Sequence, residues 1–183
     1  GPALTAIVEG LPAGLLLRAE MIDRDLRRRQ TGYGRGGRQK IEQDQVELLG
    51  GLVGDRTIGA PLSMLIRNRD WENWRGRAVA PWTRPRPGHA DLAGAVKYGL
   101  DDLRLVAERA SARETAARVA VGAVAKAVLA EVGVRVGSYV LAIGGVRAEV
   151  EALSLQERVA AALESDVSCP DAQAAERMRG AIS

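Results

Sequence analysis

The sequence contains one histidine, His89, within the segment RPRPGHADL at residues 84–92. Arg84 and Arg86 lie just ahead of it, and a proline and a glycine directly precede it. An imidazole exchanges a proton near neutral pH, and arginine side chains hold carboxylates and phosphates through paired N–H groups. A lone histidine is more often an ordinary surface or core residue. In this company, however, it suits the binding of a multiply charged anion and the transfer of one proton.

Arginine is used far more often than lysine, and it gathers at residues 24–38, 67–86 and 104–118. The planar guanidinium matches carboxylate and phosphate groups through a fork of donors, so these clusters indicate an anionic ligand. Contact with a nucleic-acid backbone and a simply solvated surface remain alternatives at this point. The net charge of +3 is modest and does not decide between them.

A glycine-rich segment, GYGRGGR at residues 32–38, matches the pattern G-x-G-x-x-G. In a dinucleotide-binding fold that pattern follows a strand and opens a helix, whereas here it follows an arginine-rich helix end. The G-K-[ST] sequence of a phosphate-binding P-loop is absent. The loop could bind single-stranded nucleic acid. We expect instead that it brings Arg29 and Arg35 to a ligand, since glycine lets the backbone pass close by.

Composition narrows the class of protein. The 183 residues are 46% apolar and 3% aromatic, which predicts one domain, or part of a larger one, with a core of small aliphatic side chains. One histidine and one cysteine, Cys169, exclude the usual zinc patterns, so no metal site is predicted. The single cysteine fits a reducing compartment. We find no long apolar run and no charged-then-apolar leader, so we expect a soluble, cytoplasmic protein that does not bind a membrane.

Apolar periodicity and turn residues predict the elements that carry these groups. Strands are predicted over residues 3–9, 45–53, 61–68 and 134–146, the last with a bulge at its glycines. Helices are predicted over residues 18–30 and 90–99, the second closed by Gly99, and two Ala-rich helices are predicted after residue 151. Residues 68–89, rich in Trp, Arg and Pro, are predicted to form one long functional loop.

One further helix is predicted to begin at Ala112 and to run to residue 131. Ser111 followed by Glu114 is the capping-box pattern, and residues 119–125 carry no charge on any face, which is typical of a buried helix. The start of such a helix presents free N–H groups and a positive dipole end. Because Arg109 and Arg113 flank this start, we predict an anion site there. The alternative is a capped helix with two salt-bridged arginines.

Three segments together resemble the chorismate synthase family: RRRQTGYGRGGRQKIEQDQVELLGG, RPRPGHADLAGAVKYG and ERASARETAARVAVGAVAKAVL. They occur in the family's order and at nearly its spacing. The resemblance covers most of residues 1–150 and weakens in the helical tail. It implies an α+β fold, a β-α-β sandwich with helices packed between antiparallel sheets. Residues 1–183 would then be a single partial domain of a larger one-domain enzyme that assembles as a homotetramer.

The resemblance also implies an activity. The family's lyases belong to the shikimate pathway and convert the small molecule 5-enolpyruvylshikimate 3-phosphate to chorismate. They do so by 1,4-anti elimination of phosphate, and they need reduced FMN although no net redox change occurs. His89 matches a family histidine close to the flavin, which implies a catalytic role in proton transfer.

The remaining site residues are carried over in the same way. The residues that match arginines expected to bind the substrate's phosphate and carboxylates are Arg29, Arg35, Arg86 and Arg113. The residues that match a flavin-contacting segment are Arg109, Ala110 and Ser111.

The sequence departs from the family's pattern at several points. Gly1 matches the last glycine of the motif Gly-Glu-Ser-His-Gly, so the histidine of that motif is absent from the 183 residues, as is a C-terminal half with a catalytic aspartate. The loop between Trp74 and Arg84 is shorter than is usual. We therefore expect these residues alone to be inactive. Two alternatives stay open: an inactive remnant of the fold that binds a partner or caps an oligomer, and an arginine-rich nucleic-acid binder.

Overall fold

The structure, a computed structural model, describes residues 1–34, 43–110 and 112–183. They form two compact units, residues 1–26 with 44–127 and residues 27–43 with 128–183. Helices and small antiparallel sheets make up the fold, which confirms the predicted α+β class. The assignment of residues 1–183 to a single partial domain stays a prediction. Across the described residues, no helix is both long enough and apolar enough to span a bilayer.

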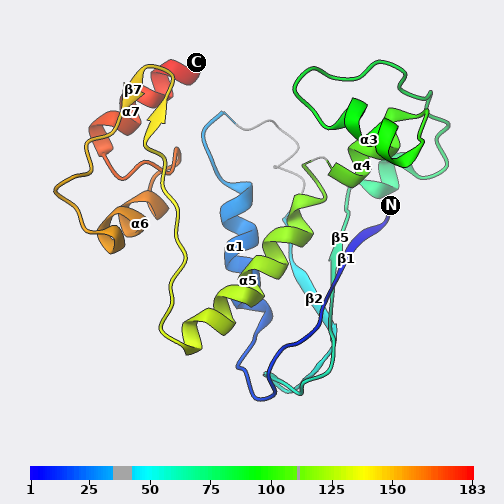
Figure 1. The fold of residues 1–183 in the computed structure, drawn as a ribbon, viewed down its shortest axis with the longest axis horizontal. Coiled ribbons are helices and arrows are strands. Elements are labelled where there is room, and N and C mark those ends of the chain that lie inside the picture. The colour runs from blue at the N-terminus through cyan, green and yellow to red at the C-terminus, as the bar shows by residue number, and fades with distance from the viewer. Residues whose placement is uncertain (35–42, 111) are drawn as a thin grey trace. The chain divides into compact units, whose positions relative to one another are not determined.

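The first unit contains a three-stranded antiparallel sheet in the order β1 (Ala3–Val8), β5 (Leu62–Arg67), β2 (Val46–Gly50) (Figure 1). Alternate residues of the central strand, Leu62, Met64 and Ile66, are buried. Successive side chains of a strand point to opposite faces, so this alternation places one face of the sheet against the core. The strands predicted over residues 3–9 and 61–68 are confirmed.

The strand predicted over residues 45–53 is interrupted. It ends as β2 at Gly50, and β3 (Leu52–Val53) pairs separately with β4 (Arg56–Thr57). Gly51 between them has a φ of +92°, and a Cβ there would lie 2.7 Å from the backbone of Leu62. Only glycine fits this close approach at positive φ, so the chain turns where the sequence pattern alone suggested continuous strand.

Helix α1 (Ala19–Gln30) confirms the helix predicted over residues 18–30. Ile22 and Leu26 are fully buried, and the carboxylate of Asp23 accepts a hydrogen bond of 2.8 Å from the backbone N–H of Val46 at the start of β2. Asp23 is also buried, so this bond compensates for the loss of hydration at both groups. It fixes α1 against the beginning of the strand.

The predicted helix start at Ala112 is wrong, because α5 runs over Thr115–Glu131 and a further helix, α4 (Leu103–Ala110), precedes it. α4 buries Leu103, Val106 and Ala107, the i, i+3, i+4 stripe of an amphipathic helix. Helix α5 is not buried all round either. Its buried residues form one stripe: Ala116, Ala120, Ala123, Val124 and Ala127.

The second unit has a small core of its own. Helices α6 (Leu155–Leu163) and α7 (Ala172–Ile182) confirm the two helices predicted after residue 151. Met178 of α7 and Cys169 are buried in a cluster against which the hairpin of β6 (Ala142–Ile143) and β7 (Val146–Arg147) packs.

The strand predicted over residues 134–146 is wrong for most of its length. Among the described residues, only the two-residue strands of this hairpin pair here, and Gly144 with Gly145 makes the turn rather than a bulge. Val134 and Val136 are 47% and 57% exposed. Their alternation therefore has no buried face to cover, and strand preference depends on such packing.

The region between the sheet and α5 is mostly irregular. It contains one helical turn, α2 (Trp71–Trp74), which lies inside the loop predicted over residues 68–89, and the rest of that range is irregular. Helix α3 (Asp91–Tyr98) follows and confirms the helix predicted over residues 90–99, and α4 comes after it (Figure 1). Gly99 ends α3 in the left-handed conformation, with a φ of +63°, as predicted. α3 packs on α4 at Gly94, where an added Cβ would lie 2.3 Å from Cγ1 of Val106.

We predict that Gly94→Ala destabilises the chain by about 1–3 kcal/mol, because the methyl group would force the two helices apart. The matched control is Gly122→Ala in α5, where an added Cβ meets nothing within 4 Å. That substitution should stabilise the helix by up to about 1 kcal/mol. Urea unfolding of both variants checks this, and equal shifts in the same direction would contradict the close packing of α3 on α4.

Candidate active site

The loop that carries His89 has almost no buried side chain. From residue 72 to residue 90, every side chain is exposed except Arg86, which is partly buried. Apolar burial therefore contributes little to its order. Hydrogen bonds to the starts of α3 and α4 hold the loop, and two aspartates accept most of these bonds.

The first aspartate is Asp91, the first residue of α3, with a side chain 1% exposed. Arg86 donates to its two carboxylate oxygens from Nε and Nη2, each at 2.9 Å, and the backbone N–H of Arg86 adds a third bond of 3.0 Å. These bonds from Arg86 hold the pKa of Asp91 well below its usual range. The Arg86 guanidinium also lies over the ring of Trp82, 5.4 Å from its centroid.

The second aspartate is Asp102, directly before α4. Its Oδ1 accepts from the backbone N–H groups of Trp82 and Arg104, both at 3.0 Å, the second as in a helix N-cap. The Arg104 guanidinium donates to both oxygens of Asp102 and, through Nη1, to the carbonyl of Val79 at 2.7 Å. The side-chain bonds from Arg104 lower the pKa of Asp102. The N–H of Leu103 donates to the carbonyl of Trp82 at 2.9 Å.

His89 lies in the turn between Arg86 and α3 and is exposed. Its backbone N–H donates to the carbonyl of Arg86 at 3.3 Å, and its Nδ1 lies 3.0 Å from the carbonyl oxygen of Pro87. A carbonyl oxygen only accepts, so Nδ1 must be the donor. In the neutral ring this leaves the lone pair on Nε2, which is the atom that can take up and release a proton.

Arg113 lies in the turn before α5, close to the predicted helix-start site. Its Nη1 donates to Oδ1 of Asp44 at 2.5 Å, and its Nη2 donates to the carbonyl of Arg67 at 2.7 Å. Asp44 has a side chain 1% exposed. Arg113 is thus salt-bridged, as the alternative reading of the sequence held, and its guanidinium is fixed between the end of β5 and the residues before β2.

Beside this pair, Asn68 follows directly on β5. Its Nδ2 donates to the carbonyl of Gly1 at 3.0 Å, and its backbone N–H donates to the carbonyl of Pro2 at 2.9 Å. Its Oδ1 is buried and has no hydrogen-bond partner among the described residues. Asn68 therefore holds the start of β1 beside the end of β5.

Arg109 and Ala110 are the last residues of α4, not neighbours of a buried helix start, which corrects the dipole argument made for Arg109. A cation is favourable at this C-terminal end instead. The Arg109 guanidinium lies over the ring of Tyr98, 4.7 Å from its centroid, and lowers the pKa of that hydroxyl. Ser111 lies outside the described residues.

Arg29 and Arg35 belong to a different part of the chain. Arg29 is in the last turn of α1 and in the second unit, and Arg35 lies outside the described residues. The start of the glycine loop is attached within that unit, since the N–H of Tyr33 donates to the carbonyl of Asp166 at 2.9 Å. The structure brings Arg86 and His89 together, whereas a shared role for Arg29 and Arg35 stays a prediction.

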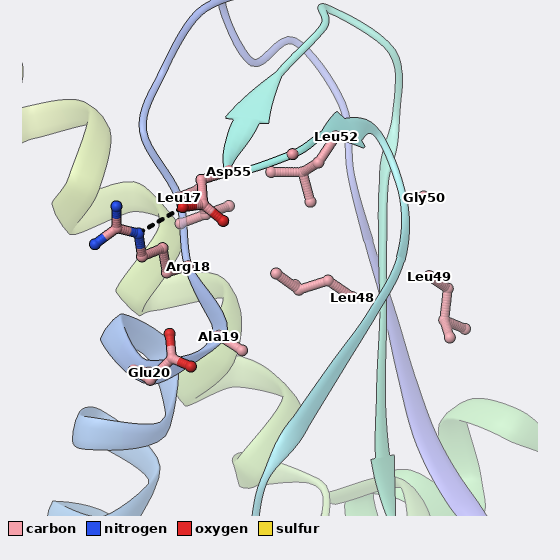
Figure 2. A pocket seen from close by; sticks show the side chains of 10 residues that line it. Leu17, Arg18, Ala19, Glu20, Leu48, Leu49, Gly50, Leu52 and Asp55 are labelled. Carbon is pink, nitrogen blue, oxygen red and sulfur yellow. Dashed lines mark hydrogen bonds and ion pairs between the residues drawn. The ribbon is translucent and has the colours of Figure 1, made fainter.

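A cavity of about 340 Å³ lies elsewhere in the first unit, between the start of α1 and the β2–β3 turn. Figure 2 shows the Arg18–Asp55 ion pair, 2.7 Å long, to one side and Leu48 and Leu52 to the other. None of the predicted site residues lines this cavity. It therefore adds no residue to the candidate site.

Comparison with known proteins decides the family. The profile of chorismate synthase matches residues 1–183. The chorismate synthase of Rubrobacter xylanophilus is 56% identical over 100% of this chain, and that of Geobacillus kaustophilus is 53% identical over 100%. A solved chorismate synthase crystal structure superposes with a TM-score of 0.76 at 38% identity, covering 98% of this chain. The chain belongs to the chorismate synthase family.

The match extends through the second unit, including the helical tail in which the sequence resemblance weakened. The chain covers 48% and 50% of those two relatives' lengths and 48% of the solved chain. It thus spans about half the length of the chorismate synthases that it matches. Family membership is therefore established for this half.

The sequence pointed to Arg86 and Arg113 but not to the aspartates that pair with them. Asp44, Asp91 and Asp102 were not singled out, although each holds an arginine of the first unit. A signal existed for Asp102, since an aspartate directly before an i, i+3, i+4 apolar stripe is typical of a helix start. None existed for Asp44, whose partner is 69 residues away in the sequence.

We predict that Asp91 stabilises the fold at neutral pH and stops doing so in acid. Its folded pKa is lowered relative to the unfolded value of about 3.9. Stability from the pair is therefore present above about pH 5 and declines as pH falls below about 4. The free energy of unfolding should exceed that of Asp91→Asn by a constant amount from pH 7 to pH 5, and the difference should shrink in stronger acid. A difference that grew with acidification would refute the pairing.

Proposed function

We propose that this chain forms part of a chorismate synthase that eliminates phosphate from 5-enolpyruvylshikimate 3-phosphate in the 1,4-anti sense, using reduced FMN. The observation that carries the proposal is the family match over all 183 residues. Because the relatives are about twice as long, the activity is proposed for a protein that combines this chain with the segments that the relatives add. Cytoplasmic location and homotetrameric assembly belong to the same proposal.

Substrate binding is proposed for the arginines. The substrate carries a phosphate and two carboxylates, and guanidinium groups bind such anions with directed N–H bonds. Arg86 already uses Nε and one Nη2 hydrogen on Asp91, so it offers the substrate its Nη1 edge in a fixed orientation. Arg113 is oriented by Asp44, which accepts from Nη1, and by the carbonyl of Arg67, which accepts from Nη2. Arg29 and Arg35 are proposed to bind further anionic groups of the substrate.

Flavin binding is proposed for Arg109, Ala110 and Ser111. The fit is supported by chemistry, because the exposed Arg109 guanidinium, held over Tyr98, suits an anionic or electron-rich planar group. When bound, reduced FMN supplies an electron transiently while the reaction remains redox-neutral overall. The residues of this chain bind the two molecules, orient them and move the proton.

Proton transfer is proposed for His89. Its Nδ1–H is engaged with the carbonyl of Pro87, which leaves Nε2 to hold or release a proton beside Arg86. Removing a positioned acid-base group typically costs about 10²–10⁴-fold in rate. The exposure of His89 in this half leaves the ring accessible to a partner molecule.

The activity is testable with a chimera in which residues 1–183 replace the matching half of the Geobacillus kaustophilus relative. Under anaerobic conditions with reduced FMN and 5-enolpyruvylshikimate 3-phosphate, we expect steady formation of chorismate, followed by absorbance. The 183-residue chain alone is the comparison, and we expect it to show no turnover. A folded, flavin-binding chimera that makes no chorismate would favour the alternative of an inactive remnant.

In the same chimera, His89→Ala should lower kcat by about 10²-fold or more, with little change in flavin affinity. Val79→Ala is the matched control, since it alters an exposed side chain of the same loop but keeps the carbonyl that Arg104 binds. It should retain the activity of the parent. If the turnover of His89→Ala were within about threefold of the parent's, His89 would be an ordinary surface residue with no role in proton transfer.

A further inference from the structure

We propose that Asp91 and Asp102 are positioning residues that act together, through the loop before α3, to set the place and tautomer of His89. The inference rests on the proposed function in taking His89 as the proton-transfer group. Neither aspartate is proposed to touch the substrate or the flavin. Each acts through hydrogen bonds to other residues of the loop.

The need for such residues follows from the exposure of the loop. Fixing the backbone of one residue costs roughly 1–2 kcal/mol in conformational entropy, and between residues 75 and 90 no buried apolar side chain offsets that cost. Hydrogen bonds join the loop to the two helices, and those from Trp82 and Arg86 converge on two carboxylates, Asp102 and Asp91. Without these bonds, the loop would sample many conformations.

Asp91 acts on His89 over a short path. It fixes the backbone and the guanidinium of Arg86 through three hydrogen bonds, and the carbonyl of Arg86 accepts the backbone N–H of His89. Residues 86–91 thus form a turn closed by hydrogen bonds, and His89 is one of its residues. Within this turn, Pro87 presents the carbonyl that holds Nδ1–H.

Asp102 acts on the same turn over a longer path. It holds the backbone N–H of Trp82, while Arg104 joins it to the carbonyl of Val79. The Trp82 ring in turn makes a cation–π contact with the Arg86 guanidinium, whose Cζ lies 5.4 Å from the ring centroid. The two aspartates thus constrain one arginine, and through it one histidine.

The first test uses the fact that the 183-residue chain has a single histidine. In the chain labelled with ¹⁵N-histidine, at about two pH units above the usual histidine pKa of about 6.5, the imidazole shifts report which nitrogen carries the proton. We expect the Nδ1–H form to dominate. In Asp91→Asn, and to a smaller degree in Asp102→Asn, the signal should move toward the Nε2–H form that free histidine prefers.

The matched control is Glu114→Gln, which weakens an arginine–carboxylate pair of the same unit, Glu114 with Arg118 at 2.8 Å, away from the loop. It should leave the histidine signal unchanged. If both aspartate variants give the parent signal, or if Glu114→Gln shifts it equally, the positioning role is overturned.

The second test is a double-mutant cycle in the chimera. A displacement of a catalytic group by about 1 Å can cost about 10²-fold, so each aspartate variant should lower kcat about 10- to 100-fold, with the flavin affinity unchanged. In the His89→Ala background, the same substitutions should lower kcat little further, because that loss acts through the missing imidazole. A raised KM for the substrate is expected from Asp91→Asn in either background, since Asp91 also orients Arg86. Fully additive losses would contradict the proposal, since they would mark a general structural role.

The two tests separate the two claims. A chimera without activity, together with the expected histidine shifts, would reject the proposed function and keep the positioning role. An active chimera whose aspartate variants match the parent in both kcat and histidine tautomer would support the proposed function and reject the positioning role.

Discussion

Pairing of arginine with buried aspartate organises the first unit. Asp91 and Asp44 both have side chains only 1% exposed, and each receives an arginine from a distant or irregular segment. A buried carboxylate without a cation is strongly unfavourable, so these pairs must form for the loop and the turn before α5 to take their places. Arg86 and Arg113 therefore stabilise the fold by pairing with these aspartates.

The same pairing fixes the orientation of the two guanidinium groups. Arg86 binds Asp91 through Nε and Nη2, whereas Arg113 binds Asp44 through Nη1 and the carbonyl of Arg67 through Nη2, so both guanidinium groups have set orientations. Under the proposed function, a substrate anion would meet preoriented groups, and its binding would cost less conformational entropy of these side chains. The positive charge is partly neutralised in advance, which favours directed hydrogen bonds over general attraction of anions.

Sequence reasoning succeeded where a local pattern sufficed. Strands β1 and β5 of the first sheet, helix α1, and α3 with Gly99 at its end all follow from periodicity and turn chemistry. It failed where distant partners decide the outcome. The pattern S-x-x-E occurs at 111–114 and at 154–157. Ser154 forms a capping box with Glu157, whereas α5 begins only at Thr115, after the first copy, and Ser111 lies outside the described residues. Residues 134–141 have the sequence pattern of a strand, but no strand pairs with them among the described residues.

The same limit applies to the site. Residue types and motif spacing predicted roles for His89 and the arginines, and these roles stay predictions, whereas the carboxylates that pair with Arg86 and Arg113 became apparent only from the fold. The central claim is that the carboxylates of Asp91 and Asp102, and not apolar packing, hold the loop of His89. Amide hydrogen exchange of the 183-residue chain tests it most directly. The account predicts slow exchange at Trp82 and Arg86, whose N–H groups donate to Asp102 and Asp91, and fast exchange at Arg84 between them. Equally fast exchange at all three would contradict it.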